Sequence, residues 1–267
     1  MNCQPKTQDD IVHMRLACRL ASEVLDYITP FVKVGVTTRE LDQLCLAYMR
    51  DVQGTRSATL GYAPEGSPPF PGAICTSLND VVCHGIPGER ALKNGDALNI
   101  DITVITKDGY YGDNSRMFIV GEGSILARRL TQIAFECMWL GIAQVRPGGR
   151  LGDIGHAIQT HAEGAGYSVV REYCGHGIGQ QFHEDPQVLH YGRRATGMEM
   201  QAGMIFTVEP MINAGKRDIR LMPDGWTVKT RDRGLSAQWE HTVLVTDEGY
   251  EVLTRSEGTQ APPAFVV

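Results

Sequence analysis

Two aspartates, Asp101 and Asp113, lie in the stretch ALNIDITVITKDGYYGDNSRM at residues 97–117. Apolar and polar residues alternate over 98–105, which is typical of a β-strand, so Asp101 is expected to face away from the main packing side. The Lys-Asp-Gly sequence at 107–109 predicts a turn, and a second short strand then carries Asp113. A two-residue turn would place the carboxylates on opposite faces, whereas an odd-numbered loop or a bulge would place them on one face. We expect the odd loop or the bulge.

On one face of a hairpin, the two Cβ atoms would be about 5 Å apart in a direct pair and about 7–8 Å apart in a diagonal pair. Carboxylates that close repel each other, so either the pKa of one rises or a cation binds between them. The alternative is a hairpin with one solvated acid on each strand. The rest of the chain has to decide between these interpretations.

Two glutamates and a histidine elsewhere in the chain favour the cation. Glu209 in FTVEP and Glu240 in SAQWEH lie on apolar-flanked strands, where an unpaired carboxylate is costly. His176 is flanked by glycines in CGHGIG. With Asp101 and Asp113 they make four carboxylates and one imidazole, a formal charge of −4 that two divalent ions neutralise. Oxygen-rich ligation with one nitrogen and no thiolate favours Mn²⁺, Fe²⁺, Co²⁺ or Zn²⁺.

The composition bounds the class of protein. The chain has 267 residues, 42% of them hydrophobic, which is enough for a sizeable core. A net charge of −6 argues against a chain-wide electrostatic grip on DNA or on an anionic membrane. The start, MNCQPKTQDD, resembles neither a signal nor a transit peptide, and no apolar run approaches the ~20 residues of a membrane span. Seven cysteines without a CxxC indicate reduced thiols, so we expect a cytoplasmic protein.

The organisation along the chain predicts one α+β domain. The expected elements are a helix at 9–27, a second helix from the capping box at 37–40 to about 52, an ordered loop with four prolines at 61–71, a strand pair over 73–83 around a turn at 78–80, and a Ser124-capped helix ending near 145. A weak echo at an offset of 113 residues, between Val34-Gly35 and Pro147-Gly148, suggests a two-fold pseudo-repeat. Helices would then lie outside a central antiparallel sheet.

Seven stretches, taken in order, resemble the type I methionine aminopeptidases, in their short bacterial form, of the pita-bread metallopeptidases. The matching stretches are NDVVCHGIP, NIDITVI, YYGDNS, EYCGHGIG, FHEDPQV, FTVEPMI and SAQWEH, and the resemblance runs from about Asp9 to Arg255. It implies the pita-bread (creatinase/aminopeptidase-like) fold and a single catalytic domain over 1–267, with the core at about 9–255 and short tails. One departure is the segment APEGSPP at 63–69, which is several residues longer than in many relatives.

The resemblance also implies a role for each metal ligand. Asp101 would be a bidentate ligand of one ion, Asp113 and Glu240 would bridge two ions, and His176 and Glu209 would complete the second ion's site. A water or hydroxide bridging the two metals would attack the peptide carbonyl, as a metal-activated nucleophile does near neutral pH. Glu209 is the candidate general base.

Two further histidines and an apolar pocket complete the implied site. His183 would contact the scissile peptide and stabilise the developing oxyanion, and His84 would hydrogen-bond its nitrogen. The methionine side chain would enter a pocket in which aromatic rings suit a thioether. By resemblance, the residues lining that pocket are Tyr62, Phe70, Cys75, Phe182 and Trp226. Removal of N-terminal methionine from nascent chains with a small second residue is the implied reaction.

Several other interpretations are weighed against this one. Cys83 beside His84 could indicate a cysteine hydrolase, but neighbours on a strand face opposite ways, so the dyad would have poor geometry. A pita-bread binding module without catalysis would be expected to lack a ligand, and prolidase relatives usually carry a large N-terminal domain. We assign no role to His13, His156, His161, His190 or His241, and we place His156 and His161 on a polar, solvated helix.

The segment 216–233 carries six of the 25 basic residues, diluted by three aspartates. One interpretation is a solvated face. The other is a docking patch for ribosomal RNA, in keeping with a nascent-chain substrate. We expect a monomer that binds neither DNA nor a membrane.

Overall fold

Four α-helices form the outer layer of the molecule. The computed structural model describes residues 4–266, so Cys3 lies outside the described residues. The helices are α1 (Gln8–Ile28), α2 (Thr38–Ala47), α3 (Ile125–Ile142) and α4 (Leu151–Gly164), with a 3-10 turn at Thr29–Phe31 and a π-helical stretch at Tyr48–Gln53. Thr7 and Thr37 each close a capping box, and the Ser124 side chain caps α3. The second helix therefore begins where predicted, although its last turn is π-helical.

The strands form four short antiparallel sheets in the described part of the chain. The first contains β1 (Arg56–Ser57), β4 (Ala97–Ile105), β2 (Cys75–Leu78) and β5 (Tyr111–Ile119); the second contains β13 (Ser236–Gln238), β10 (Met211–Asn213) and β6 (Ser168–Val169). The third contains β11 (Ile219–Leu221), β12 (Val228–Thr230) and β3 (Val81–Cys83); the fourth contains β15 (Tyr250–Val252), β14 (His241–Val245), β9 (Ile205–Val208), β7 (Gly175–Gly177) and β8 (Glu184–Val188).

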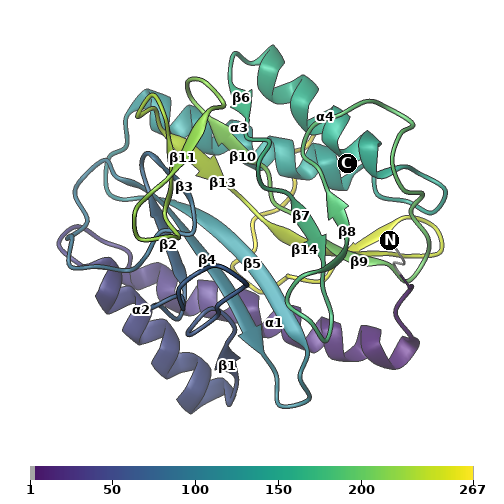
Figure 1. Cartoon of the computed structure of the whole chain (residues 1–267), viewed down its shortest axis with the longest axis horizontal. Coiled ribbons are helices and arrows are strands. Elements are labelled where there is room, and N and C mark those ends of the chain that lie inside the picture. Colours follow the sequence, from purple (N-terminus) through teal and green to yellow (C-terminus); the bar gives the residue numbers. More distant parts are fainter. Residues whose placement is uncertain (1–3, 267) are drawn as a thin grey trace.

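The hairpin of β4 and β5 crosses the centre of the molecule (Figure 1). Its loop, residues 106–110, has an odd length, and Thr103 pairs with Asp113 while Asp101 pairs with Ser115. The two aspartates therefore share one face as diagonal neighbours, which confirms the odd-loop prediction. Gly109 in this loop has φ +84°, a conformation that favours glycine.

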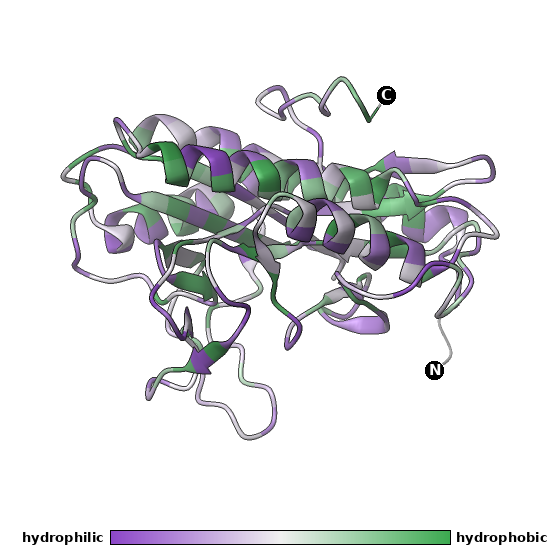
Figure 2. Ribbon diagram, turned by 90° about the horizontal axis from the view of Figure 1, so that it is seen from above, coloured by the Kyte–Doolittle hydropathy of each residue, from purple (hydrophilic) through white to green (hydrophobic). Residues whose placement is uncertain are grey.

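The opposite face of β4 explains why the strand alternates. Leu98, Ile100, Ile102 and Val104 are all buried in a core cluster shared with α1 and α2. A second core lies around α3 and α4, where Met138, Ile154 and Phe206 are buried. Each pair of helices thus covers strands from outside, and Figure 2 shows the helices on one side of the strands with long loops projecting from the other. The predicted α+β arrangement, with helices outside antiparallel strands, is confirmed (Figure 2).

One local prediction was wrong. The strands β2 and β3 exist on either side of the predicted turn, but they do not pair with each other. Strand β2 pairs with β4, and β3 pairs with β12, nearly 150 residues further along the chain. Asn79 in the turn has φ +56°, and its side chain bonds to Asp96 and to the backbone of Ala97. The turn therefore directs the two strands into different sheets.

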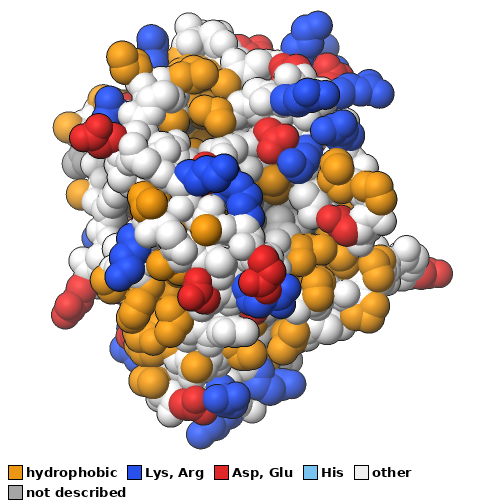
Figure 3. Space-filling model, turned by 90° about the vertical axis from the view of Figure 1, so that its left-hand side faces the viewer, with side chains coloured by type: hydrophobic (Ala, Val, Ile, Leu, Met, Phe, Trp, Pro, Cys, Tyr) orange, Lys and Arg blue, Asp and Glu red, His pale blue; other side chains and the backbone are white. Residues whose placement is uncertain are grey.

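The surface carries mixed charge. On the side shown in Figure 3, Lys and Arg side chains are interspersed with Asp and Glu side chains. Among residues 4–266, no helix is both long enough and apolar enough to cross a bilayer.

Candidate metal centre and substrate cleft

The five predicted ligands come from five strands that converge. Asp101 lies on β4, Asp113 on β5 and His176 on β7, while Glu209 directly follows β9 and Glu240 directly precedes β14. Strands β7, β9 and β14 are neighbours in one sheet, and a bridge between Ser115 and Glu240 joins that sheet to β5. The two halves of the chain therefore meet where the acidic side chains lie.

The ligand atoms are close enough to share ions. His176 Nε2 is 3.6 Å from Asp113 Oδ2 and 3.6 Å from Glu209 Oε1. One ligand atom each from Asp113, His176 and Glu240 lie within 4.8 Å of one another. His176 Nδ1 is 3.0 Å from the Gly177 carbonyl oxygen, to which it donates, so the Nε2 lone pair points toward the acids. That is the tautomer of a metal-ligating histidine.

Burial without a counter-charge raises the pKa of all four carboxyl groups. Asp113 and Glu240 are buried, and Asp101 and Glu209 are half-buried. Desolvation raises the pKa of Asp101 to about 7 and that of Glu209 to about 8. The pKa values of Asp113 and Glu240 lie well above the ordinary range because of desolvation first and neighbouring carboxylates second. In the described part of the chain, no Lys or Arg lines this cleft.

The donor set fits divalent cations. Asp101 Oδ1 is a buried atom without a hydrogen-bond partner among residues 4–266, which is costly unless a cation binds there. Four carboxylates and one correctly oriented imidazole are hard and borderline ligands of the kind that Mn²⁺, Fe²⁺, Co²⁺ and Zn²⁺ accept. The repulsion among the acids would be relieved by the same ions.

Three polar side chains that the sequence analysis did not single out orient these ligands. Thr103 Oγ1 donates to Asp113 Oδ1 at 2.9 Å. Thr207 Oγ1 accepts the His176 backbone N–H at 3.0 Å and donates to Glu209 Oε1 at 2.7 Å, while Gln238 Nε2 donates to Glu209 Oε2 at 3.2 Å. Each lies two residues from a ligand, or directly across the hairpin, so strand alternation could have indicated that it shares the ligand's face.

One missed histidine belongs to this surrounding shell. His190 is fully buried, and its Nε2 accepts the backbone N–H of Glu209 at 3.2 Å. Nothing in the sequence near His190 signals this contact, because it joins residues 19 positions apart through a loop. The interpretation of His156 and His161 as solvated was also wrong. Both are half-buried, and His161 Nε2 is 2.7 Å from Glu136 on α3.

The predicted substrate residues line one cleft of about 520 Å³ beside the acids. These residues are Tyr62, Phe70, Cys75, His84, Phe182, His183 and Trp226. The aromatic rings contact one another. The ring centroids of Phe70 and Trp226, which meet edge to face, are 5.3 Å apart, and those of Tyr62 and Phe182 are 5.1 Å apart. An apolar wall of this kind, next to charged groups, can bind a hydrophobic side chain and present its backbone to the acids.

Two histidines flank the acids within the cleft. His84 has φ +55° directly after β3, and desolvation lowers its pKa to about 4. His183 lies at the exposed mouth of the cleft, stacked on Phe182 with 4.1 Å between ring centroids, and desolvation again lowers its pKa. Both rings are neutral near pH 7, so each offers one donor and one acceptor.

The geometry of Cys83 differs from the expectation but does not make it a nucleophile. Because of the positive φ of His84, both residues line the cleft rather than facing opposite ways. Desolvation, followed by the charges of Glu209 and Asp101, raises the pKa of the Cys83 thiol well above its ordinary value. A reactive cysteine needs the reverse shift.

Fold and site together define a metallopeptidase. Residues 12–247 match the metallopeptidase family M24, and the chain belongs to that family. It is 55% identical over 258 residues to "Methionine aminopeptidase" of Escherichia coli K12, covering 96% of each chain, and 53% identical to that of Rickettsia prowazekii, again covering 96% of each. The crystal structure of the Rickettsia prowazekii methionine aminopeptidase superposes with a TM-score of 0.91 at 52% identity, covering 95% of this chain and 100% of that one. The resemblance inferred from the sequence is thereby confirmed.

A more distant neighbour shows how far the fold extends. A prolidase from Pyrococcus furiosus superposes with a TM-score of 0.72 at 20% identity, covering 95% of this chain and 66% of that one. At that identity the likeness shows the fold alone.

Proposed function

We propose that this chain is a single catalytic domain that removes N-terminal methionine from peptides whose second residue is small. The observation that carries the proposal is the convergence of four carboxylates and His176 beside an aromatic cleft that no Lys or Arg among residues 4–266 lines. Further support comes from two methionine aminopeptidases that are 55% and 53% identical to this chain over 96% of its length. The proposed substrates are nascent chains, which would place the activity in the cytoplasm.

Two divalent ions match the formal charge of the site. We propose that Asp101, Asp113, His176, Glu209 and Glu240 would hold these ions. When bound, the ions would supply Lewis-acid polarisation of the peptide carbonyl and activation of water. The donor set accepts cobalt, manganese, iron or zinc, which metal analysis distinguishes.

The side chains of the cleft divide the remaining chemistry. Glu209, ionised when divalent cations bind beside it, accepts the proton of the attacking water. His183 donates to the carbonyl oxygen as negative charge develops there, and His84 hydrogen-bonds the peptide nitrogen. Tyr62, Phe70, Cys75, Phe182 and Trp226 enclose the methionine side chain.

The decisive experiment is hydrolysis of Met-Ala-Ser, with metal analysis, before and after chelation. We expect about two ions per chain, loss of turnover on chelation, and its recovery on adding a divalent ion. Leu-Ala-Ser and Met-Leu-Ser should be poor substrates, because the first lacks methionine and the second has a large second residue. Turnover that survives complete metal removal would overturn the proposal.

Two substitutions test the division of labour. Glu209→Gln should lower kcat by about 10²–10⁴, the range for loss of a general base. Cys83→Ala should retain turnover, whereas a cysteine hydrolase would lose it. An unchanged rate in Glu209→Gln would exclude Glu209 as the base.

We also propose that the basic segment 216–233 of a monomeric enzyme contacts ribosomal RNA. Arg217 and Arg220 are exposed on and beside β11, although Lys229 is already paired with Asp80 at 3.1 Å. Charge reversal at Arg217 and Arg220 should reduce co-sedimentation with ribosomes, and the same reversal at Arg50, an exposed arginine on the π-helical stretch, should not. Equal co-sedimentation of all variants would remove the idea.

A further inference from the structure

A hydrogen bond at the mouth of the cleft joins Tyr62 to His183. The Tyr62 hydroxyl oxygen is 3.1 Å from His183 Nδ1, and the two ring centroids are 5.7 Å apart. The other ring nitrogen of His183, Nε2, has no hydrogen-bond partner within residues 4–266. Tyr62 is therefore the described side chain that holds a nitrogen of this ring.

When the Tyr62 hydroxyl donates, the hydrogen bond places the hydrogen of His183 on Nε2. A phenol with an ordinary pKa near 10 is protonated at neutral pH and can donate. A neutral imidazole has one donor and one acceptor nitrogen, so a ring that accepts at Nδ1 carries its hydrogen on Nε2. His183 lines the cleft beside the acids, so an Nε2–H is available to donate to a ligand there.

The loop that follows Tyr62 is held by hydrogen bonds at its base and near its end. The backbone N–H of Phe70 donates to the Tyr62 carbonyl at 2.8 Å, and that of Gly61 donates to the Phe70 carbonyl at 2.9 Å. These two bonds close the base of the loop 63–69. The Trp226 indole N–H donates to the Pro68 carbonyl at 2.7 Å, which ties the end of the loop to a distant part of the chain.

Ring packing restrains Tyr62 further. Its ring lies 5.1 Å from Phe182 and 6.2 Å from Trp226, both in tilted contacts. His183 is in turn stacked on Phe182. These ring contacts restrain the rotation of both rings of the hydrogen-bonded pair.

We propose that Tyr62 is a positioning residue whose hydroxyl selects the His183 tautomer with hydrogen on Nε2, so that His183 presents a donor to the substrate's carbonyl oxygen. This inference rests on the proposed function and adds to it a second duty for Tyr62 besides lining the pocket. The loop 63–69, closed at its base and held by Trp226, is the device that keeps the hydroxyl in place.

The first test is Tyr62→Phe, which keeps the ring and removes the hydroxyl. We expect kcat for Met-Ala-Ser to fall about threefold to tenfold, the range for loss of one hydrogen bond, with KM nearly unchanged. The matched control is Tyr111→Phe, because the Tyr111 ring stacks on Phe182 at 5.7 Å while its hydroxyl has no hydrogen-bond partner in the described chain. Tyr111→Phe should stay within about twofold of the parent.

A double-mutant cycle separates positioning from pocket lining. If Tyr62 acts through His183, then adding Tyr62→Phe to His183→Ala should cost no further activity. An equal loss in both backgrounds would show that the hydroxyl acts on something other than His183 and would overturn the inference. A parent enzyme unable to cleave Met-Ala-Ser would instead overturn the proposed function, so the two failures are distinguishable.

A spectroscopic readout does not depend on turnover. In the zinc-loaded enzyme, long-range ¹H–¹⁵N spectra report which nitrogen of each histidine is protonated, and the His183 signals are assigned by their loss in His183→Ala. We expect the Nε2–H tautomer in the parent and in Tyr111→Phe, and a mixture in Tyr62→Phe. A parent ring protonated on Nδ1 would contradict the proposal whatever the kinetics show.

Discussion

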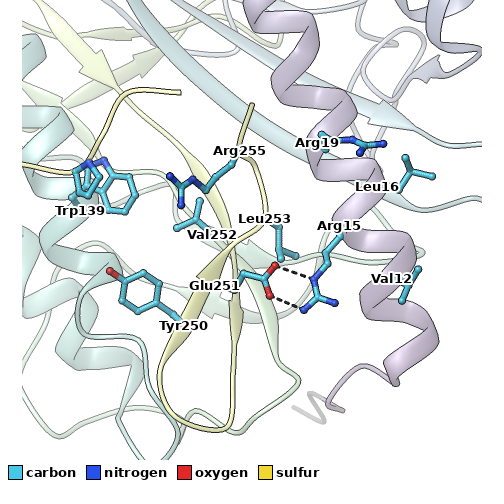
Figure 4. Close-up of a pocket in the computed structure, with 11 residues that line it drawn as sticks. Val12, Arg15, Leu16, Arg19, Trp139, Tyr250, Glu251, Val252, Leu253 and Arg255 are labelled. Atoms are coloured by element: carbon cyan, nitrogen blue, oxygen red, sulfur yellow. Dashed lines mark hydrogen bonds and ion pairs between the residues drawn. The ribbon is translucent and has the colours of Figure 1, made fainter. Parts of the chain in front are cut away.

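Two hollows on this molecule differ in whether their acidic side chains are paired with basic ones. The first is an open groove of about 720 Å³ between α1 and β15, shown in Figure 4, and the second is the smaller cleft beside the candidate metal centre. In the groove, Glu251 accepts two hydrogen bonds from Arg15, at 2.9 Å and 2.7 Å. In the cleft, four carboxylates have no guanidinium or ammonium group beside them within the described chain.

The candidate reactive site is therefore distinguished by carboxylates without a basic partner, and not by the volume of the hollow. In an exposed, bidentate ion pair such as Arg15 with Glu251, each side chain neutralises the charge of the other and supplies its hydrogen-bond partners. Such a pair contributes little to stability. Carboxylates withdrawn from water and left without a partner destabilise the protein unless something else binds them. The fold tolerates this arrangement only where a ligand supplies the missing positive charge.

The largest expected effect compares the same substitution in both hollows. Glu240→Gln should lower turnover by roughly 10³-fold or more, because a bound metal ion supplies several kcal/mol of transition-state stabilisation. It should also lower the metal content measured in the purified protein. Glu251→Gln, which removes one charge from the groove, should leave turnover within about twofold. Similar losses in the two variants would erase the distinction between the hollows.

The next effect separates charge from catalysis. His183→Ala removes a neutral side chain from the cleft and should cost on the order of 10²–10³ in kcat, the range for an oxyanion donor. Arg15→Ala removes a charged side chain from the groove and should change kcat less than twofold. We would abandon the oxyanion role if His183→Ala were as active as Arg15→Ala in the Met-Ala-Ser assay.

A smaller effect tests the hydrogen bonds that orient the ligands. Thr207→Val should lower metal affinity by roughly 10–100-fold, as expected for a group that orients a ligand. Thr131→Val is the matched control, because the Thr131 hydroxyl is buried and has no partner among residues 4–266. Metal titration followed by activity measures both. Equal affinity in the two variants would show that Thr207 fills space only.

Local features of the fold could be predicted from the sequence, whereas the pairing of distant strands could not. The alternation in β4 and the odd loop placed Asp101 and Asp113 on one face, because strand period and hairpin geometry are local properties. The capping box from Thr37 to Glu40 was likewise readable from residues three positions apart. The partners of β2 and β3 were not predictable, since the choice of sheet depends on strands that lie far along the chain.

The candidate site divides in a similar way. Residue type and strand pattern indicated the four acids and the one imidazole that need a cation. The groups that orient them were missed, because a threonine, a glutamine or the buried His190 acquires its role only from a neighbour in space. The bond from Tyr62 to His183 spans 121 positions and has no local signal at all.

The smallest expected effect is the pH dependence of stability in the metal-free protein. Unfolded Asp and Glu titrate near pH 4, whereas desolvation raises the pKa of folded Asp101 to about 7 and that of folded Glu209 to about 8. Between pH 7 and 8 the folded chain therefore binds more protons than the unfolded chain, so its stability falls as the pH rises. The histidines with lowered pKa act in the opposite sense, but they do so mainly below their ordinary pKa of about 6.5.

The Tm in the presence of a chelator should accordingly fall by at least about 3–5 °C from pH 7 to 8, because Asp101 and Glu209 together hold about one extra proton over this range and the raised pKa values of Asp113 and Glu240 add to it. Bound divalent ions favour the ionised carboxylates, so this fall should vanish in the metal-loaded protein. Glu251→Gln should reproduce the parent slope, because its exposed pair lies outside the cluster, whereas Glu209→Gln should flatten it. A slope that is identical with and without metal would show that the carboxylates of the cleft are not what the ions neutralise.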